Sequence, residues 1–273
     1  MNNVLYAFLL TLGAGLATGI GSVLAFFTKR TNTRFLSIIL GFSAGVMIFI
    51  SLVEIYVQSQ VTLVGCLGQI WGSWAALASF LGGIFLIGII DKFVPEAENP
   101  HAVQKVEEVD RVERKMEMET ELDPKKLHRM GLFTALAITI HNFPEGLATF
   151  VAALKEPTLG LAIAVAIALH NIPEGIAVSI PIYYATGSKK RAFIYSFLSG
   201  LAEPLGAIVG YLILMPFMTD TLFGVIFGMV GGIMVYISFD ELLPSAQKYG
   251  EHHLSIYGLV AGMVVMAVSM IYL

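Results

Sequence analysis

The chain alternates between long apolar stretches and polar intervals over almost its whole length. A helix that spans a bilayer needs about 20 mostly apolar residues, and eight stretches reach that length. The pattern therefore predicts an all-α membrane protein with eight transmembrane helices, forming a single transmembrane domain over residues 1–273. The predicted helices lie at about residues 4–27, 35–57, 70–91, 130–154, 158–183, 192–215, 221–243 and 254–272.

One polar interval is much longer than the others and covers residues 92–128, between the third and fourth predicted helices. Acidic and basic residues alternate along it, which is typical of a solvated segment. We interpret it as a charged loop inside a single membrane domain.

The positions of Lys and Arg predict the orientation of the helices. Of the 16 Lys and Arg residues, Lys155 alone falls on the opposite side from the rest if there are eight helices. Cytoplasmic loops carry the excess of these residues. The loop at 92–128 is therefore predicted to be cytoplasmic and both termini to lie outside, in a multi-pass protein of the inner or plasma membrane.

Composition supports the membrane assignment and argues against a nucleic-acid partner and a thiolate metal site. The chain is 56% hydrophobic and 13% charged, whereas soluble domains carry roughly 25% charged residues, so the lipid bilayer is an expected partner. A net charge of −4 argues against a nucleic-acid partner. The single cysteine, Cys66, excludes a metal site built from several thiolates.

Two nearly identical polar motifs, HNFPEG and HNIPEG, interrupt the fourth and fifth apolar stretches. On a helix, residues three and four positions apart share a face, so each motif presents an imidazole, an amide and a carboxylate to one side. Proline in each motif lacks an amide proton, which frees a carbonyl of the preceding turn. The residues concerned are His141, Asn142 and Glu145 in the first copy and His170, Asn171 and Glu174 in the second.

The two motifs are predicted to meet near the middle of the membrane. A very short connection makes the fourth and fifth helices antiparallel neighbours, and Glu203 lies at a similar depth in the sixth. A carboxylate at the bilayer centre costs roughly 3 kcal/mol on insertion scales unless it is paired or hydrated. Because no Lys or Arg lies at this depth, the partner must be a proton or a metal cation.

Four other residues within or near the predicted helices outline a pathway on either side of the motifs. Their carboxylates and thioether could pass a cation toward or away from the membrane centre. These pathway candidates are Met47, Glu54, Asp240 and Glu241.

These polar residues are compatible with three classes of function. Mixed nitrogen and oxygen ligands favour a transporter of zinc, ferrous iron, manganese, cobalt or cadmium. A proton-coupled carrier of another solute would use the acids but gives no reason for the duplicated His and Asn. An intramembrane metalloenzyme would be expected to carry a motif such as H-E-x-x-H, which is absent, so an enzyme is the least favoured reading.

The segments HNFPEGLATF, HNIPEGIAVSIPIYYATGSKKRA, SGLAEPLGA and DELLP resemble the ZIP (Zrt- and Irt-like) family of divalent metal transporters, in particular a bacterial zinc-uptake branch. The resemblance implies an eight-helix bundle that moves the ion into the cytoplasm. The metal would be a substrate, with no resident cofactor, and a homodimer is left open.

The resemblance also implies a site for two metal ions in which Glu145 and Glu174 bridge. The first ion would be held by Glu145, His170 and Glu174, with His141 close by. The second would be held by Asn142, Glu145, Asn171, Glu174 and Glu203.

Overall fold

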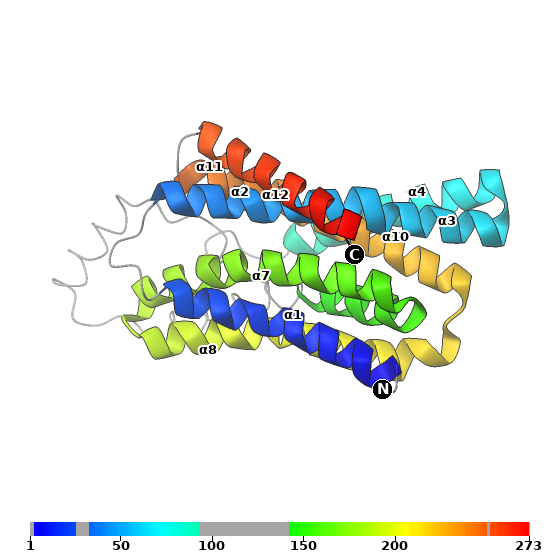
Figure 1. Ribbon diagram of the computed structural model, residues 1–273, viewed down its shortest axis with the longest axis horizontal. Coiled ribbons are helices and arrows are strands. Elements are labelled where there is room, and N and C mark those ends of the chain that lie inside the picture. The colour runs from blue at the N-terminus through cyan, green and yellow to red at the C-terminus, as the bar shows by residue number, and fades with distance from the viewer. Residues whose placement is uncertain (1–2, 26–32, 93–141, 250–251, 273) are drawn as a thin grey trace.

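The computed structural model describes residues 3–25, 33–92, 142–249 and 252–272, and within these ranges all regular structure is helical (Figure 1). Seven of its helical stretches are long and apolar enough to cross a membrane, which confirms the predicted class. The eighth predicted helix, at 130–154, is described only from residue 142, where a helix runs over 142–155. The seven stretches are Asn3–Leu24, Ser37–Leu67, Gln69–Lys92, Pro157–Ile176, Lys189–Phe217, Asp220–Gln247 and His253–Ile271.

Several of these stretches are built from consecutive helical elements. The elements are α1 (Asn3–Ala25), α2 (Thr33–Ile50), the π-helical turn η1 (Ser51–Ile55), α3 (Tyr56–Leu67), α4 (Gln69–Lys92), α7 (Pro157–Thr186), α8 (Lys189–Gly200), α9 (Ala202–Val209), the π turn η3 (Gly210–Leu214), the 3₁₀ turn η4 (Met215–Phe217), α10 (Asp220–Ile237), the π turn η5 (Ser238–Leu242), α11 (Leu243–Tyr249) and α12 (His252–Tyr272).

The helices form two groups that lie side by side (Figure 1). In one group α1 packs along α7, α8 and α9, and the helix over 142–155 lies with them. In the other, α12 packs along α2, while α10 packs against α3 and α4. The two groups meet chiefly where α2 runs along α7. The interface between α2 and α7 therefore lies at the centre of the molecule.

A single extended residue joins the helix over 142–155 to α7. Glu156 adopts φ −142° and ψ 109°, and Pro157 begins α7, a position where the missing amide proton costs no hydrogen bond. The short connection confirms that the two helices bearing the motifs are adjacent and antiparallel. It places the motifs opposite one another, because each lies a similar distance from this turn.

Helix α7 continues through Pro173 as far as Thr186, so the second motif lies on an unbroken helix. Departures from α-helical geometry lie elsewhere in the described residues, and they include the three π turns. Two of these turns contain pathway candidates: η1 contains Glu54, and η5 contains Asp240 and Glu241. Such turns occur frequently at functional sites.

The second membrane helix is longer than the sequence pattern predicts. The expected end at residue 57 reflects the polar residues that follow, yet α3 continues to Leu67. Ser59 is buried, and its hydroxyl donates to the carbonyl oxygen of Gly224 in α10 at 2.6 Å. Because this polar group is satisfied by a neighbouring helix, the helix continues, and Glu54 lies within it rather than at its end.

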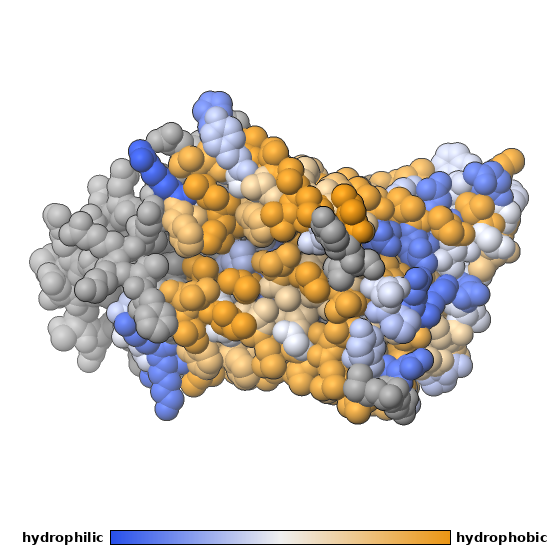
Figure 2. All heavy atoms as spheres, in the orientation of Figure 1, coloured by the Kyte–Doolittle hydropathy of each residue, from blue (hydrophilic) through white to orange (hydrophobic). Residues whose placement is uncertain are grey.

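Apolar side chains cover the middle of the molecule, and hydrophilic ones gather toward its two ends (Figure 2). This distribution is the one expected for a protein that exposes its middle to lipid tails and its ends to water. Helix α4 illustrates it, since large apolar side chains such as Phe85 (66% exposed) and Ile89 (58% exposed) face outward.

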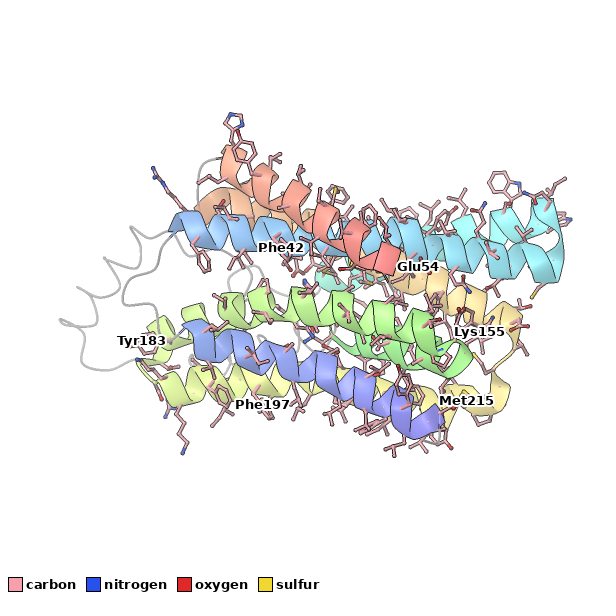
Figure 3. The ribbon with its side chains drawn as sticks, viewed as in Figure 1. Phe42, Glu54, Lys155, Tyr183, Phe197 and Met215 are labelled. Carbon is pink, nitrogen blue, oxygen red and sulfur yellow. The ribbon has the colours of Figure 1, made fainter. Side chains whose placement is uncertain are left out.

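One ion pair links the helix over 142–155 to α10 at the end of the molecule near the α3–α4 turn (Figure 3). Lys155 Nζ lies 3.0 Å from Asp220 Oδ1 and 4.0 Å from the centre of the Phe223 ring. Asp220 is 71% exposed, so water screens the pair.

We expect Lys155→Met to lower the free energy of unfolding by about 1 kcal/mol or less. Thermal unfolding in detergent, with Asp220→Asn as the partner variant, measures this; a much larger loss would contradict it.

Candidate metal centre

Six polar side chains from the two motifs and α9 lie together in the apolar interior. They come from three helices of one group, and each is at most 1% exposed. The first histidine of the motifs, His141, lies outside the described residues. The six side chains are Asn142, Glu145, His170, Asn171, Glu174 and Glu203.

His170 lies between the two motif glutamates. Its Nε2 atom is 3.8 Å from Glu145 Oε1 and 3.8 Å from Glu174 Oε2. Its other ring nitrogen, Nδ1, makes a hydrogen bond with the hydroxyl of Ser43 in α2. The ring is thus held on one side by a helix of the other group, while its Nε2 side faces the two motif acids.

Both motif asparagines use their NH₂ groups to bind backbone carbonyls of neighbouring helices. Asn142 Nδ2 donates to the carbonyl oxygen of Ser199 at 3.2 Å. Asn171 Nδ2 donates to the carbonyl oxygen of Ala14 at 2.8 Å and also to Glu203 Oε1. Within the described residues the Oδ1 atoms of both asparagines have no hydrogen-bond partner. The amide oxygens therefore remain available to a cation.

Glu174 and Glu203 also have carboxylate oxygens that could bind a cation. Among the described residues, both oxygens of Glu174 and Oε2 of Glu203 lack a hydrogen-bond partner of standard geometry, although the amide of Asn142 lies near the Glu174 carboxylate. Glu145 lies within electrostatic reach of both acids. Neither Glu174 nor Glu203 pairs with a Lys or Arg in the described part of the chain. Because burying a charge without a partner is costly, this cluster favours a proton or a cation.

The ligand atoms of the cluster lie near one another, but they are not close enough together to coordinate one metal ion. No group of three His, Cys, Asp or Glu side chains in the described residues is arranged so that it could hold a metal ion. Zinc binds nitrogen and oxygen at about 2.0–2.1 Å, so two ligands of a tetrahedral ion lie about 3.3 Å apart. The 3.8 Å separations around His170 exceed this slightly. Small side-chain rotations would therefore be needed to bind an ion.

The glycine that ends each motif lets the neighbouring helices approach. A Cβ atom added at Gly146 would overlap the backbone of Glu203, and one added at Gly175 would overlap the carbonyl oxygen of Thr18. Their repetition in both motifs is the signal in the sequence that could have indicated this role. They bring α9 and α1 close enough to contribute to the centre.

Ser43 is a third residue near the centre that no sequence motif marks. It is buried in α2 and lies one helical turn before Met47, so the two share a face. Its position opposite His170 follows from the packing of α2 on α7, which the sequence pattern does not reveal.

The pathway candidates lie outside the cluster, on either side of it. Met47 is buried in the second membrane helix, and Glu54, further along that helix, lies near Glu156 at the turn before α7.

The remaining two candidates, Asp240 and Glu241, follow α10. Glu241 lies near Asp91 at the end of α4 and within electrostatic reach of Glu174. The carboxylates thus extend from the cluster toward the two ends of the molecule.

The class that the fold and this centre define is a multi-pass membrane protein, helical throughout its described elements, with a buried cluster of imidazole, amide and carboxylate groups. The chain belongs to the ZIP zinc transporter family, which it matches over residues 66–270. This membership places it among transporters rather than enzymes and confirms the resemblance seen in its motifs.

Curated relatives resemble the chain over nearly its full length. It is 61% identical over 271 residues to the zinc transporter ZupT of Lysinibacillus sphaericus, covering 99% of this chain and 98% of the relative. It is 61% identical over 273 residues to the zinc transporter ZupT of Oceanobacillus iheyensis, covering both chains completely. The zinc transporter ZupT of Streptococcus mutans is 58% identical over 265 residues, covering 97% of this chain and 96% of the relative.

Proposed function

We propose that the protein takes up divalent transition metal ions, zinc first among them, across the cytoplasmic membrane and into the cytoplasm. The observation that carries the proposal is the buried cluster, which brings one imidazole, two amides and three carboxylates together in the apolar interior. The names of the relatives support zinc as a substrate. Nitrogen and oxygen ligands would also accept iron, manganese, cobalt or cadmium.

We propose two metal positions that share Glu145 and Glu174. The first would use these two acids with His170, and its support is the equal separation of His170 Nε2 from both carboxylates. His141 would lie close by. A bridging carboxylate is favourable here because it reduces the repulsion between two dications a few ångströms apart.

The second position would combine the bridging acids with Asn142, Asn171 and Glu203. Its support is the orientation of the asparagines, whose NH₂ groups are held by backbone carbonyls while Oδ1 has no hydrogen-bond partner among the described residues. The contact between Asn171 and Glu203 places these two ligands together.

The proposed route passes Glu54 and Met47 before the cluster and Glu241 and Asp240 after it. Its support is the location of these residues on either side of Glu174, with Glu54 near the turn that precedes α7. With both termini outside, that turn faces the exterior, and the route then runs inward.

Uptake into proteoliposomes tests the proposed function. Purified protein should carry zinc into vesicles, and an excess of cadmium or cobalt should compete, whereas magnesium or calcium should compete poorly because they prefer all-oxygen sites. Vesicles that contain Glu174→Gln protein are the matched control. Zinc entry equal to that of protein-free vesicles would overturn the proposal.

The orientation yields a separate prediction about the loop at 92–128. In a Cys66→Ser background, a cysteine introduced at Glu107 should react with a membrane-impermeant maleimide only after the cells are opened, because basic residues on its side predict a cytoplasmic location. Cys66 itself, which is exposed near the α3–α4 turn, should react in intact cells. Labelling of residue 107 in intact cells would reverse the proposed topology.

A further inference from the structure

We propose that Ser43 is a positioning residue for metal binding, because its hydroxyl sets the orientation of the His170 ring. The inference rests on the proposed function, in which His170 binds the metal through Nε2. Ser43 lies in α2, whereas the six polar residues of the centre belong to the other group of helices. The metal centre would therefore be completed by a contact across the interface between the two groups.

The contact joins two fully buried side chains. Ser43 and His170 are each 0% exposed, and the Ser43 hydroxyl bonds with His170 Nδ1. The opposite ring nitrogen, Nε2, then faces Glu145 and Glu174. A ring rotated by half a turn about its χ2 angle would lose the bond with Ser43 and would move Nε2 away from the acids.

Helix α2 packs closely against α12 on the face opposite Ser43, and this packing limits movement of the Ser43 hydroxyl. Gly41 and Gly45 lie two residues before and after Ser43, on the opposite face of the helix. A Cβ atom at Gly41 would overlap the carbonyl oxygen of Ser255, and one at Gly45 would overlap that of Leu259, both in α12. Close backbone packing on that face leaves α2 little freedom to carry Ser43 away from His170.

A hydroxyl is suited to this position because it can accept or donate. A histidine that binds a metal through Nε2 carries its proton on Nδ1 and donates it to a second group, a role in which Ser43 Oγ is the acceptor. In the other tautomer, with the proton on Nε2, the Ser43 hydroxyl can donate to Nδ1 instead. Ser43 thus keeps the ring in one orientation both before and after an ion is bound.

Calorimetric titration of the full-length protein with zinc in detergent tests the inference. Loss of a group that orients a metal-bound histidine typically lowers metal affinity by about 10- to 100-fold, and we expect this for Ser43→Ala. The matched control is Ser37→Ala in the same helix. Ser37 is also fully buried and its hydroxyl also bonds to another helix, at Ala246 O. It lies six residues before Ser43, more than one and a half helical turns along α2, and its partner is not part of the centre, so zinc affinity should stay unchanged.

Two further comparisons separate orientation of the ring from packing. Ser43→Thr keeps the hydroxyl and Ser43→Val removes it at nearly the same volume, so Thr should retain zinc affinity and Val should lose it. In a His170→Ala background, Ser43→Ala should cause no further loss, because the two residues act as one unit. The absorption spectrum of bound cobalt should change in Ser43→Ala and Ser43→Val and stay unchanged in Ser37→Ala.

The outcomes distinguish this inference from the proposed function. A wild-type protein that binds no zinc would overturn the proposed function and the inference together. Suppose instead that the wild-type protein binds zinc. If Ser43→Ala or Ser43→Val then shows the same affinity and the same cobalt spectrum, only the role of Ser43 is overturned. Equal losses in the Thr and Val variants, or additive losses with His170→Ala, would also overturn it, since both indicate a packing effect.

Discussion

Zinc uptake should fall to background in Glu174→Ala and in Glu174→Gln. In the proposed arrangement Glu174 binds both metal ions, so either substitution removes one ligand from each position and leaves the two dications poorly screened. The Gln variant keeps the volume of the side chain and removes only its charge, so it separates metal binding from packing. Transport of radioactive zinc by proteoliposomes with matched protein content measures the effect.

The same variants should also change how zinc affects stability. A ligand that binds only the folded protein raises its stability by about 2.7 kcal/mol at 100 times its dissociation constant. Zinc should therefore raise the unfolding temperature of the wild-type protein and leave that of Glu174→Gln nearly unchanged. Without metal, Glu174→Gln should be at least as stable as the wild type, since a buried carboxylate without a hydrogen-bond partner among the described residues is removed.

Asn142→Ala is the comparison that tests the bridge. It removes a ligand from the second position only, so we expect partial uptake or an altered preference among zinc, cadmium and cobalt. Uptake by Glu174→Ala at the wild-type rate would exclude the bridging arrangement. Complete and equal losses in Asn142→Ala and Glu174→Ala would indicate that the two positions do not differ in the way proposed.

A methyl group at Gly175 should damage the fold itself. Gly175→Ala places a Cβ atom against the carbonyl oxygen and neighbouring backbone of Thr18, which cannot move unless α1 separates from α7. Overpacking in a tightly packed interior typically costs about 1–3 kcal/mol, and a clash with backbone should lie at the upper end. Gly146→Ala should behave similarly, because its Cβ atom would meet the backbone of Glu203.

The matched control is Gly13→Ala in α1, where no atom lies within 4 Å of the added Cβ. Alanine is the better helix former by about 1 kcal/mol, so this variant should be neutral or slightly stabilising. Unfolding temperatures in detergent and the yield of monodisperse protein measure the difference. A Gly175→Ala protein as stable as Gly13→Ala would show that α1 and α7 are not in the close contact described.

The sequence by itself determined the helical membrane class and the composition of the centre. Hydrophobicity is a local property, so the length of each apolar stretch indicates a spanning helix without knowledge of its neighbours. The spacing within H-N-x-P-E-G likewise places its polar side chains on one helix face. The short connection at Glu156 then required the two motifs to lie side by side, and this expectation is confirmed.

Only the tertiary structure decided how those side chains are held. The carbonyls of Ser199 and Ala14 accept the amide protons of the asparagines, and Ser43 binds His170. These partners come from helices far away in the sequence, and no local pattern distinguishes them from other buried serines and alanines. The continuation of the second membrane helix to Leu67 has a similar cause, since the acceptor for Ser59 is a carbonyl in α10. Local hydrophobicity sets where helices form, but the atoms that satisfy a buried polar group are chosen by which helices pack together.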